Sequence, residues 1–121
     1  MAKILIAEDD RITCLVLAKI LEDMGHVAIL CRDGRRAMDT LADNQDIAVV
    51  ITDVSMPEMD GRELIQNIRS NKETALLPVI MISGVVGPKE IADVLSLGAA
   101  AFLPKPINPT DLSLCVERYL G

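Results

Sequence analysis

The chain has 121 residues, half of them hydrophobic, which suits one domain with a sizeable apolar core. Because it contains only one Phe and one Tyr, the core must consist of aliphatic side chains and Met, and stacking platforms for nucleic-acid bases are not expected. The formal charge of −6 repels phosphate backbones and no basic run offsets it, so direct nucleic-acid binding is not expected either.

The cysteines and the apolar runs indicate the compartment. Cys14, Cys31 and Cys115 are widely spaced and form no Cys-x-x-Cys pair, which argues against a disulfide framework and against a zinc site. No apolar run approaches the length of a membrane span, and no signal peptide is visible. We therefore expect reduced, buried thiols and a cytoplasmic protein that does not contact a membrane.

Short apolar runs alternate with amphipathic stretches along the whole chain. Five runs are strand candidates: residues 4–7, 27–31, 48–53, 79–82 and 100–103. The stretches that follow them predict helices, whose buried side chains in chain order are Ile12, Val16, Ile20 and Met24; Ala37, Met38 and Leu41; Leu64, Ile65 and Ile68; Ile91, Val94 and Leu95; Leu112, Cys115 and Val116.

Residues suited to helix ends mark the limits of these helices. They are Gly25 after the first helix, Asp33 before the second, Asp60 before the third, Pro88 and Gly98 at the two ends of the fourth, and Asn108 with Pro109 at the start of the fifth. Each predicted helix therefore has, at one end or both, a residue whose side chain or backbone conformation suits a helix end.

The strand candidates indicate the fold class. Several are continuous apolar runs rather than alternating ones, as burial on both faces of a sheet requires. This pattern predicts a parallel sheet with helices on each side, and right-handed crossovers make it a doubly wound α/β fold. No repeat, low-complexity segment or linker divides the chain, so we expect one domain over residues 1–121.

Polar side chains stand where the predicted strands end, at the edge of an open α/β sheet where ligands bind. They are Glu8, Asp9 and Asp10 after the first strand, Asp53 at the end of the third, Ser83 and Gly84 after the fourth, and Lys105 after the fifth. Taken singly, each is more often part of a helix start, a turn or the solvated surface. We assign Asp10 to a solvated helix start. The joint order of the others favours a common site.

Four motifs span these strand ends in order. They are ILIAEDD at residues 4–10, ITDVSMPEMDG at 51–61, PVIMISG at 78–84 and FLPKP at 102–106. In this order they resemble the receiver domain of two-component response regulators, of the chemotaxis type, over essentially the whole chain. The resemblance implies a flavodoxin-like sheet of five parallel strands in the order 2-1-3-4-5, with five helices.

The resemblance also implies roles for individual residues. Asp53 would be the phosphoacceptor, which takes a phosphoryl group from a histidine kinase or a phosphotransfer protein and forms an acyl phosphate. Lys105 and Ser83 would act with it by contacting phosphoryl oxygens. Magnesium would be held directly by the carboxylates of Asp9 and Asp53 and by the backbone carbonyl of Ser55, and through a water by Glu8.

A switch and an output surface follow from the same resemblance. Ser83, Gly84 and Phe102 would form the switch, and the peptide bond before Pro106 would be cis. An effector protein or domain would bind the face made by the fourth helix, the fifth strand and the fifth helix. A homodimer that forms through this face is also compatible with the sequence. Such a protein catalyses its own phosphorylation and a slow autodephosphorylation, but it is primarily a signalling switch.

Several positions depart from the commonest pattern of the family. Serine replaces threonine at Ser83, glycine follows at Gly84, and Phe102 lacks the hydroxyl of the more usual tyrosine. We expect a looser switch loop and a partner contact without a hydrogen bond from this ring. Ser55 and Val85 occupy the two positions that often tune hydrolysis in this family.

Other classes fit the chain less well. A flavin-binding module would need a phosphate loop after the first strand, where three acids would repel phosphate. A P-loop enzyme needs Gly-Lys-Ser, and a haloacid-dehalogenase-type phosphatase needs a second acid where Ser55 stands. The remaining alternative is a receiver-like interaction module that signals without phosphorylation, against which the retained acids, Ser83 and Lys105 argue. A stand-alone regulator and a receiver within a larger protein both fit.

Overall fold

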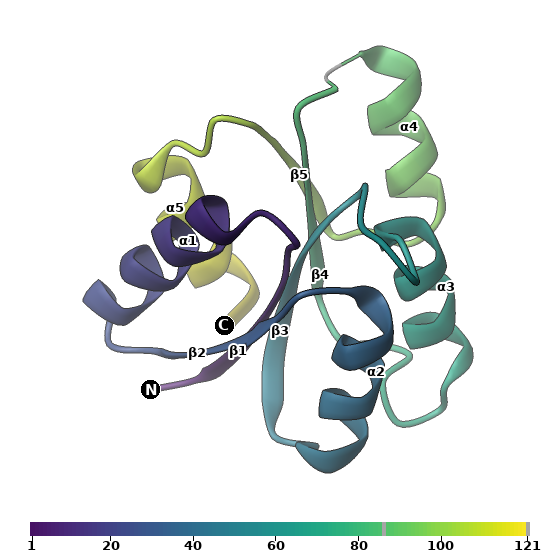
Figure 1. Ribbon diagram of the computed structural model, residues 1–121, viewed down its shortest axis with the longest axis horizontal. Helices are drawn as coiled ribbons and strands as arrows, with labels where there is room; N and C mark the ends of the chain where they lie inside the picture. Colours follow the sequence, from purple (N-terminus) through teal and green to yellow (C-terminus); the bar gives the residue numbers. More distant parts are fainter. Residues whose placement is uncertain (86, 121) are drawn as a thin grey trace.

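The computed structural model describes residues 1–85 and 87–120, over which five strands alternate with five helices (Figure 1). The strands are β1 (Lys3–Ala7), β2 (Val27–Cys31), β3 (Ile47–Asp53), β4 (Val79–Ser83) and β5 (Ala101–Pro104). The helices are α1 (Arg11–Asp23), α2 (Gly34–Asp43), α3 (Gly61–Ser70), α4 (Pro88–Ser96) and α5 (Pro109–Leu120). Every predicted strand and helix is present, with small differences at the ends.

The strands form one parallel sheet in the order β2-β1-β3-β4-β5. Figure 1 shows α1 and α5 on one side of this sheet and α2, α3 and α4 on the other. The predicted doubly wound, flavodoxin-like fold with strand order 2-1-3-4-5 is therefore confirmed. Because the strands are parallel, the segments that follow β1, β3, β4 and β5 meet at one edge of the sheet.

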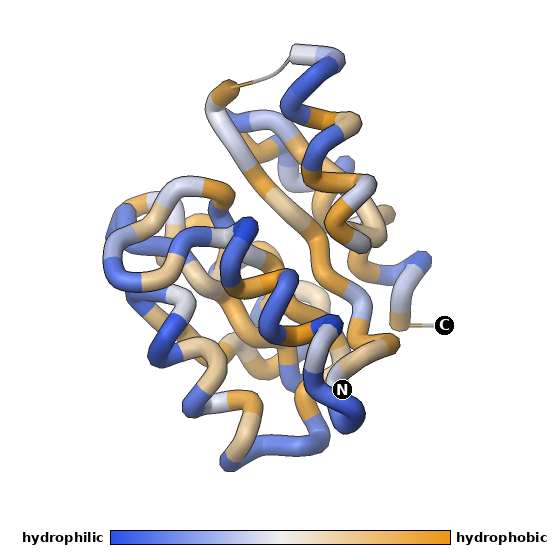
Figure 2. Tube along the Cα trace, turned by 90° about the vertical axis from the view of Figure 1, so that its right-hand side faces the viewer, coloured by the Kyte–Doolittle hydropathy of each residue, from blue (hydrophilic) through white to orange (hydrophobic). Residues whose placement is uncertain are grey.

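The central strands β1, β3 and β4 are buried on both faces, which explains their continuous apolar runs. Successive side chains point to opposite faces. Leu5 and Ala7 of β1 therefore pack with α2, α3 and α4, whereas Ile4 and Ile6 pack with α1 and α5. Figure 2 shows apolar segments concentrated along the strands and many polar segments on the outer turns of the helices.

Side-chain caps mark where four of the helices begin, and at α5 the cap is Asn108, whose Oδ1 accepts from the amide of Asp111 at 3.1 Å. Asp10, Asp33 and Asp60 precede α1, α2 and α3, and each side chain accepts a hydrogen bond from the backbone amide three residues later. α4 starts differently, because Gly87 offers no side-chain cap and Pro88 fills its first position. Asp10 thus has the ordinary role at a helix start that the sequence favoured.

The predicted face of α1 is wrong in part. Ile12 is 73% exposed and Val16 is 44% exposed, whereas Cys14, Leu17 and Leu21 are buried. Apolar residues surround most of this helix, so periodicity alone does not select one face. The row of side chains that packs is the one turned toward the sheet and α5.

The predicted face of α4 also needs correction. Leu95 is 44% exposed, Ile91 is half-buried, and Val94 is the one residue of this helix that is fully buried. α4 therefore has one fully buried side chain, Val94, which lies nearer to its C-terminal end than to Pro88.

The cysteines largely match their prediction. Cys14 and Cys31 are buried, Cys115 is half-buried, and all are free thiols. Separately, no helix among residues 1–85 and 87–120 is both long and apolar enough to cross a membrane.

Candidate functional site

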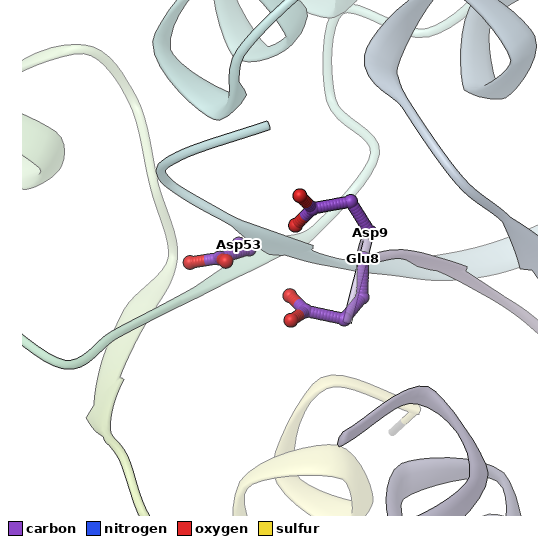
Figure 3. A group of neighbouring side chains, drawn as sticks. All are labelled: Glu8, Asp9 and Asp53. Atoms are coloured by element: carbon purple, nitrogen blue, oxygen red, sulfur yellow. The ribbon is translucent and has the colours of Figure 1, made fainter. Parts of the chain in front are cut away.

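Three carboxylates meet at the carboxyl edge of the sheet. Glu8 and Asp9 follow β1, and Asp53 is the last residue of β3, the strand next to it. Figure 3 shows the carboxylates of Glu8 and Asp9 directed to the side on which Asp53 lies, and one carboxylate oxygen from each of the three lies within 4.8 Å of the others. Glu8 is 1% exposed and Asp53 is 7% exposed, whereas Asp9 lies at the surface.

Lys105 reaches this cluster from the segment after β5, an outermost strand, at the same edge of the sheet. Its Nζ donates to Glu8 Oε1 at 3.0 Å and to Asp53 Oδ2 at 3.0 Å. The backbone amide of Lys105 donates to the carbonyl of Ser83 at 2.9 Å, which continues the β4–β5 pairing and aims the side chain inward. The Lys105–Pro106 peptide bond is cis. One amine thus joins side chains that lie 97 and 52 residues away in sequence.

The charges of this cluster shift the pKa values of its members. Burial raises the pKa of Glu8 to about 7 and the neighbouring Asp53 adds to the rise, although the hydrogen bond from Lys105 opposes it. Burial lowers the pKa of Lys105, but its hydrogen bonds to Asp53 and Glu8 outweigh this and raise the pKa overall. The Lys105 amine is therefore a cation at neutral pH. Its single positive charge only partly offsets the negative charge of the carboxylate cluster.

The donor set fits a hard divalent cation. Glu8 Oε2 is buried and has no hydrogen-bond partner among residues 1–85 and 87–120, so it retains a free acceptor beside two further carboxylates. Carboxylate oxygens are the ligands that Mg²⁺ prefers, usually together with waters. A cation here would also offset the repulsion within the cluster. Ser55 is exposed and lies two residues past Asp53, and its carbonyl remains a predicted ligand.

The loop after Asp53 is held by backbone contacts. Val54 donates to Ile82 of β4 at 3.1 Å, and Gly61 donates back to Val54 at 2.9 Å. A Cβ on Gly61 would collide with the carbonyl oxygen of Asp53, so only glycine lets α3 begin this close to β3. Gly61 was not predicted as a site residue. Its only sequence signal is the Asp-Gly pair at the end of the motif.

The predicted switch residues lie beside the cluster. Ser83 ends β4, next to β3, and is 7% exposed; its hydroxyl accepts a hydrogen bond from the Val85 amide at 3.0 Å. Its O–H remains able to donate. Gly84 is exposed, and Phe102 in β5 is half-buried against the core cluster on the α2–α3–α4 side. The structure thus brings Glu8, Asp9, Asp53 and Lys105 into contact range and places Ser83 at the adjacent strand end.

Comparison with known proteins identifies the family. Residues 4–117 match the model of the response regulator receiver domain. The chain belongs to this family.

Relatives of this receiver cover nearly its whole length. A chemotaxis protein CheY homolog of Campylobacter jejuni is 33% identical over 120 residues, which is 98% of this chain and 92% of that protein. The signal receiver domain of a signal transduction histidine kinase from Syntrophus aciditrophicus is 32% identical, with a TM-score of 0.91 over 99% of this chain and 90% of that one. Vibrio cholerae chemotaxis protein CheY4 is 28% identical, with a TM-score of 0.91 over 98% of both chains.

Proposed function

We propose that this receiver is a phosphoacceptor switch. Asp53 would accept a phosphoryl group from the phosphohistidine of a histidine kinase or a phosphotransfer protein, in a magnesium-dependent reaction. The observation that carries this proposal is the arrangement of the three carboxylates with the Lys105 amine, 3.0 Å from both Glu8 and Asp53. An ordinary surface lysine or helix-start acid has no reason to adopt this arrangement.

The chemistry follows from the charges of these side chains. An Asp53 oxygen attacks phosphorus, the new O–P bond forms, and the P–N bond of the donor breaks, leaving its electron pair on the imidazole. Magnesium, when held by Glu8, Asp9, Asp53 and the Ser55 carbonyl, supplies positive charge that offsets the carboxylates and the phosphoryl oxygens.

Lys105 and Ser83 would stabilise the transferred group. The Lys105 amine already lies beside Asp53, so it can exchange its carboxylate contact for a phosphoryl oxygen with little movement. The Ser83 hydroxyl, fixed by the Val85 amide, can donate to a second oxygen. Both groups are in place before the reaction begins, which lowers the cost of reorganisation.

The remaining parts of the proposal concern signalling. We infer one receiver domain over residues 1–121, placed in the cytoplasm where its donors act. The switch residues Ser83, Gly84 and Phe102 would shift the face of α4, β5 and α5 toward a form that an effector binds, or through which two copies pair. Slow autodephosphorylation would reset the switch.

A labelling experiment tests this proposal. Incubation with Mg²⁺ and acetyl phosphate should add one phosphoryl group to the wild-type chain, measured by intact mass, and none to Asp53→Asn. Asp39→Asn, at an exposed carboxylate on α2, is the matched control and should be labelled like the wild type. Chelation of Mg²⁺ should abolish labelling.

The same experiment distinguishes the phosphoacceptor switch from a receiver-like module that signals without phosphorylation. Equal labelling of wild type and Asp53→Asn would contradict the phosphoacceptor assignment. A folded wild-type chain that acquires no phosphoryl group would instead support a receiver-like module that binds partners without phosphorylation.

A further inference from the structure

A single arginine ties the C-terminal end of α4 to α3. Arg69, in the last turn of α3, donates from Nε and Nη2 to the carbonyl oxygen of Gly98 at 3.2 and 2.8 Å. Its Nη1 donates to the carbonyl of Leu77 at 2.7 Å and to that of Ala75 at 3.3 Å. The guanidinium therefore joins the segment that follows α4 to the segment that precedes β4.

The Arg69 side chain also covers the turn after α4 closely. Gly98 has a φ of +104°, and a Cβ on it would lie 3.0 Å from the Arg69 Nε. The helix is closed at this point by two backbone bonds, from Gly98 to Leu95 at 3.0 Å and from Ala99 to Val94 at 3.2 Å. This end of α4 is therefore held by its own backbone and by a partly buried cation.

The end of α4 nearer to Ser83 is held more weakly. The ion pair of Arg62 Nη1 on α3 with Asp93 Oδ2 lies near the middle of α4 rather than at this end; the two atoms are 3.8 Å apart, and the side chains are 38% and 46% exposed. Such exposed pairs contribute little. Gly87 provides no side-chain cap, and Val85 is 62% exposed. Within residues 1–85 and 87–120, no contact at this end matches the four hydrogen bonds of Arg69.

We propose that Arg69 is the pivot of α4. When Asp53 is phosphorylated, the change at Ser83 turns the helix about its attachment at Gly98, so the displacement is largest near Pro88. This inference rests on the proposed function, because phosphorylation supplies the change at Ser83. α4 has nine residues and is therefore about 13 Å long, and within the described residues it is held more firmly at Gly98 than at Pro88. Arg69 touches no reacting atom, so it is a positioning residue.

Hydrogen exchange of individual amides tests the pivot. The protein with Mg²⁺ is compared with and without beryllofluoride, an analogue of the phosphoryl group. In the wild type, we expect the exchange rates to change at residues 88–92 and to stay constant at Gly98 and Ala99. In Arg69→Met, the change should spread to the whole helix, and exchange at Gly98 and Ala99 should be about tenfold faster even without the analogue.

Two further variants make this test specific. Arg69→Lys keeps a cation that donates to fewer carbonyls, so it should restore part of the wild-type pattern. Arg118→Met removes an exposed arginine on α5 and should behave like the wild type. A purely structural role for Arg69 would lower stability without changing where the analogue acts along α4.

The results that overturn the pivot differ from those that overturn the phosphoacceptor role. The pivot is overturned if the analogue changes exchange in the wild type as much at Gly98 and Ala99 as at residues 88–92. It is also overturned if Arg69→Met shows the same exchange pattern as the wild type. Should Arg69→Met not fold, the same comparison is made with Arg69→Lys. Failure of acetyl phosphate to label Asp53 overturns the proposed function itself.

Discussion

Burial of like charges is the main physical feature of the candidate site at the scale of single residues. Glu8 and Asp53 are almost wholly removed from water, and the amine that accompanies them is Lys105. Glu8 Oε2 has no partner within the described residues. A carboxylate in this state is costly to ionise, and a cation or a proton relieves the cost.

This cost predicts a dependence of stability on pH in the absence of magnesium. The pKa of Glu8 is raised from 4.5 to about 7 by burial in the folded chain. Between these values the folded state holds a proton that the unfolded state releases, so the free energy of unfolding should fall as pH rises through this window. The fall amounts to as much as about 3 kcal/mol. Urea unfolding at a series of pH values measures it.

Glu8→Gln provides the decisive comparison for that slope. Glutamine carries no titrating proton, so the decline in stability should flatten in this variant. Glu117→Gln, at an exposed position on α5, should retain the wild-type slope. Identical slopes in Glu8→Gln and the wild type would show that another group causes the dependence. Saturating Mg²⁺ should flatten the wild-type curve as well.

At the scale of elements, the site depends on how closely α3 approaches β3. The first residue of α3 is Gly61, whose amide bonds to Val54 and whose Cα faces the backbone of Asp53. This contact sets the path of the loop that carries Ser55. The atoms that face Gly61 belong to the backbone of Asp53 and Val54, so they cannot move aside as the end of a flexible side chain could.

Gly61→Ala should therefore lower the free energy of unfolding by about 1–3 kcal/mol. The new Cβ would meet the carbonyl oxygen of Asp53 and lie 2.9 Å from the Cα of Val54. Gly84→Ala is the matched control, because nothing lies within 4 Å of its Cβ, and it should change stability by less than about 0.5 kcal/mol. Chemical denaturation of both variants checks this, and equal losses would contradict the close-approach argument.

At the scale of the whole molecule, two apolar clusters cover opposite faces of one sheet. The sheet decides which side of each helix is buried. In α1 it selects Leu17, which is fully buried, and leaves Ile12 73% exposed. Comparing the stability lost on truncating a buried and an exposed side chain of α1 therefore tests how this helix packs on the sheet.

Leu17→Ala should cost about 2–5 kcal/mol of stability, because it removes buried methyl groups and leaves a cavity between α1 and the sheet. Ile12→Ala should cost less than about 0.5 kcal/mol, since its side chain already faces water. Thermal and urea unfolding of the two variants give the difference. A larger loss for Ile12→Ala would mean that α1 packs through the other face.

The amino-acid sequence by itself determined the fold class, the order of the elements and the residues at the strand ends. These features depend on local patterns: continuous apolar runs for buried parallel strands, Asp caps before α1, α2 and α3, and polar residues where strands stop. Asp10 shows the same logic, because its role as a cap needs only Thr13, three residues away. Family motifs then assigned expected roles to Asp53 and its neighbours.

The tertiary structure alone decided which side chains touch. Lys105 bonds Glu8 and Asp53 because β5, β1 and β3 end at the same edge of the sheet, and no spacing in the chain encodes that contact. The buried face of α1 and the clamp of Arg69 on Gly98 also depend on neighbours distant in sequence. Local patterns report only nearby residues, whereas burial, close approach and charge pairing are properties of segments that meet after the chain has folded.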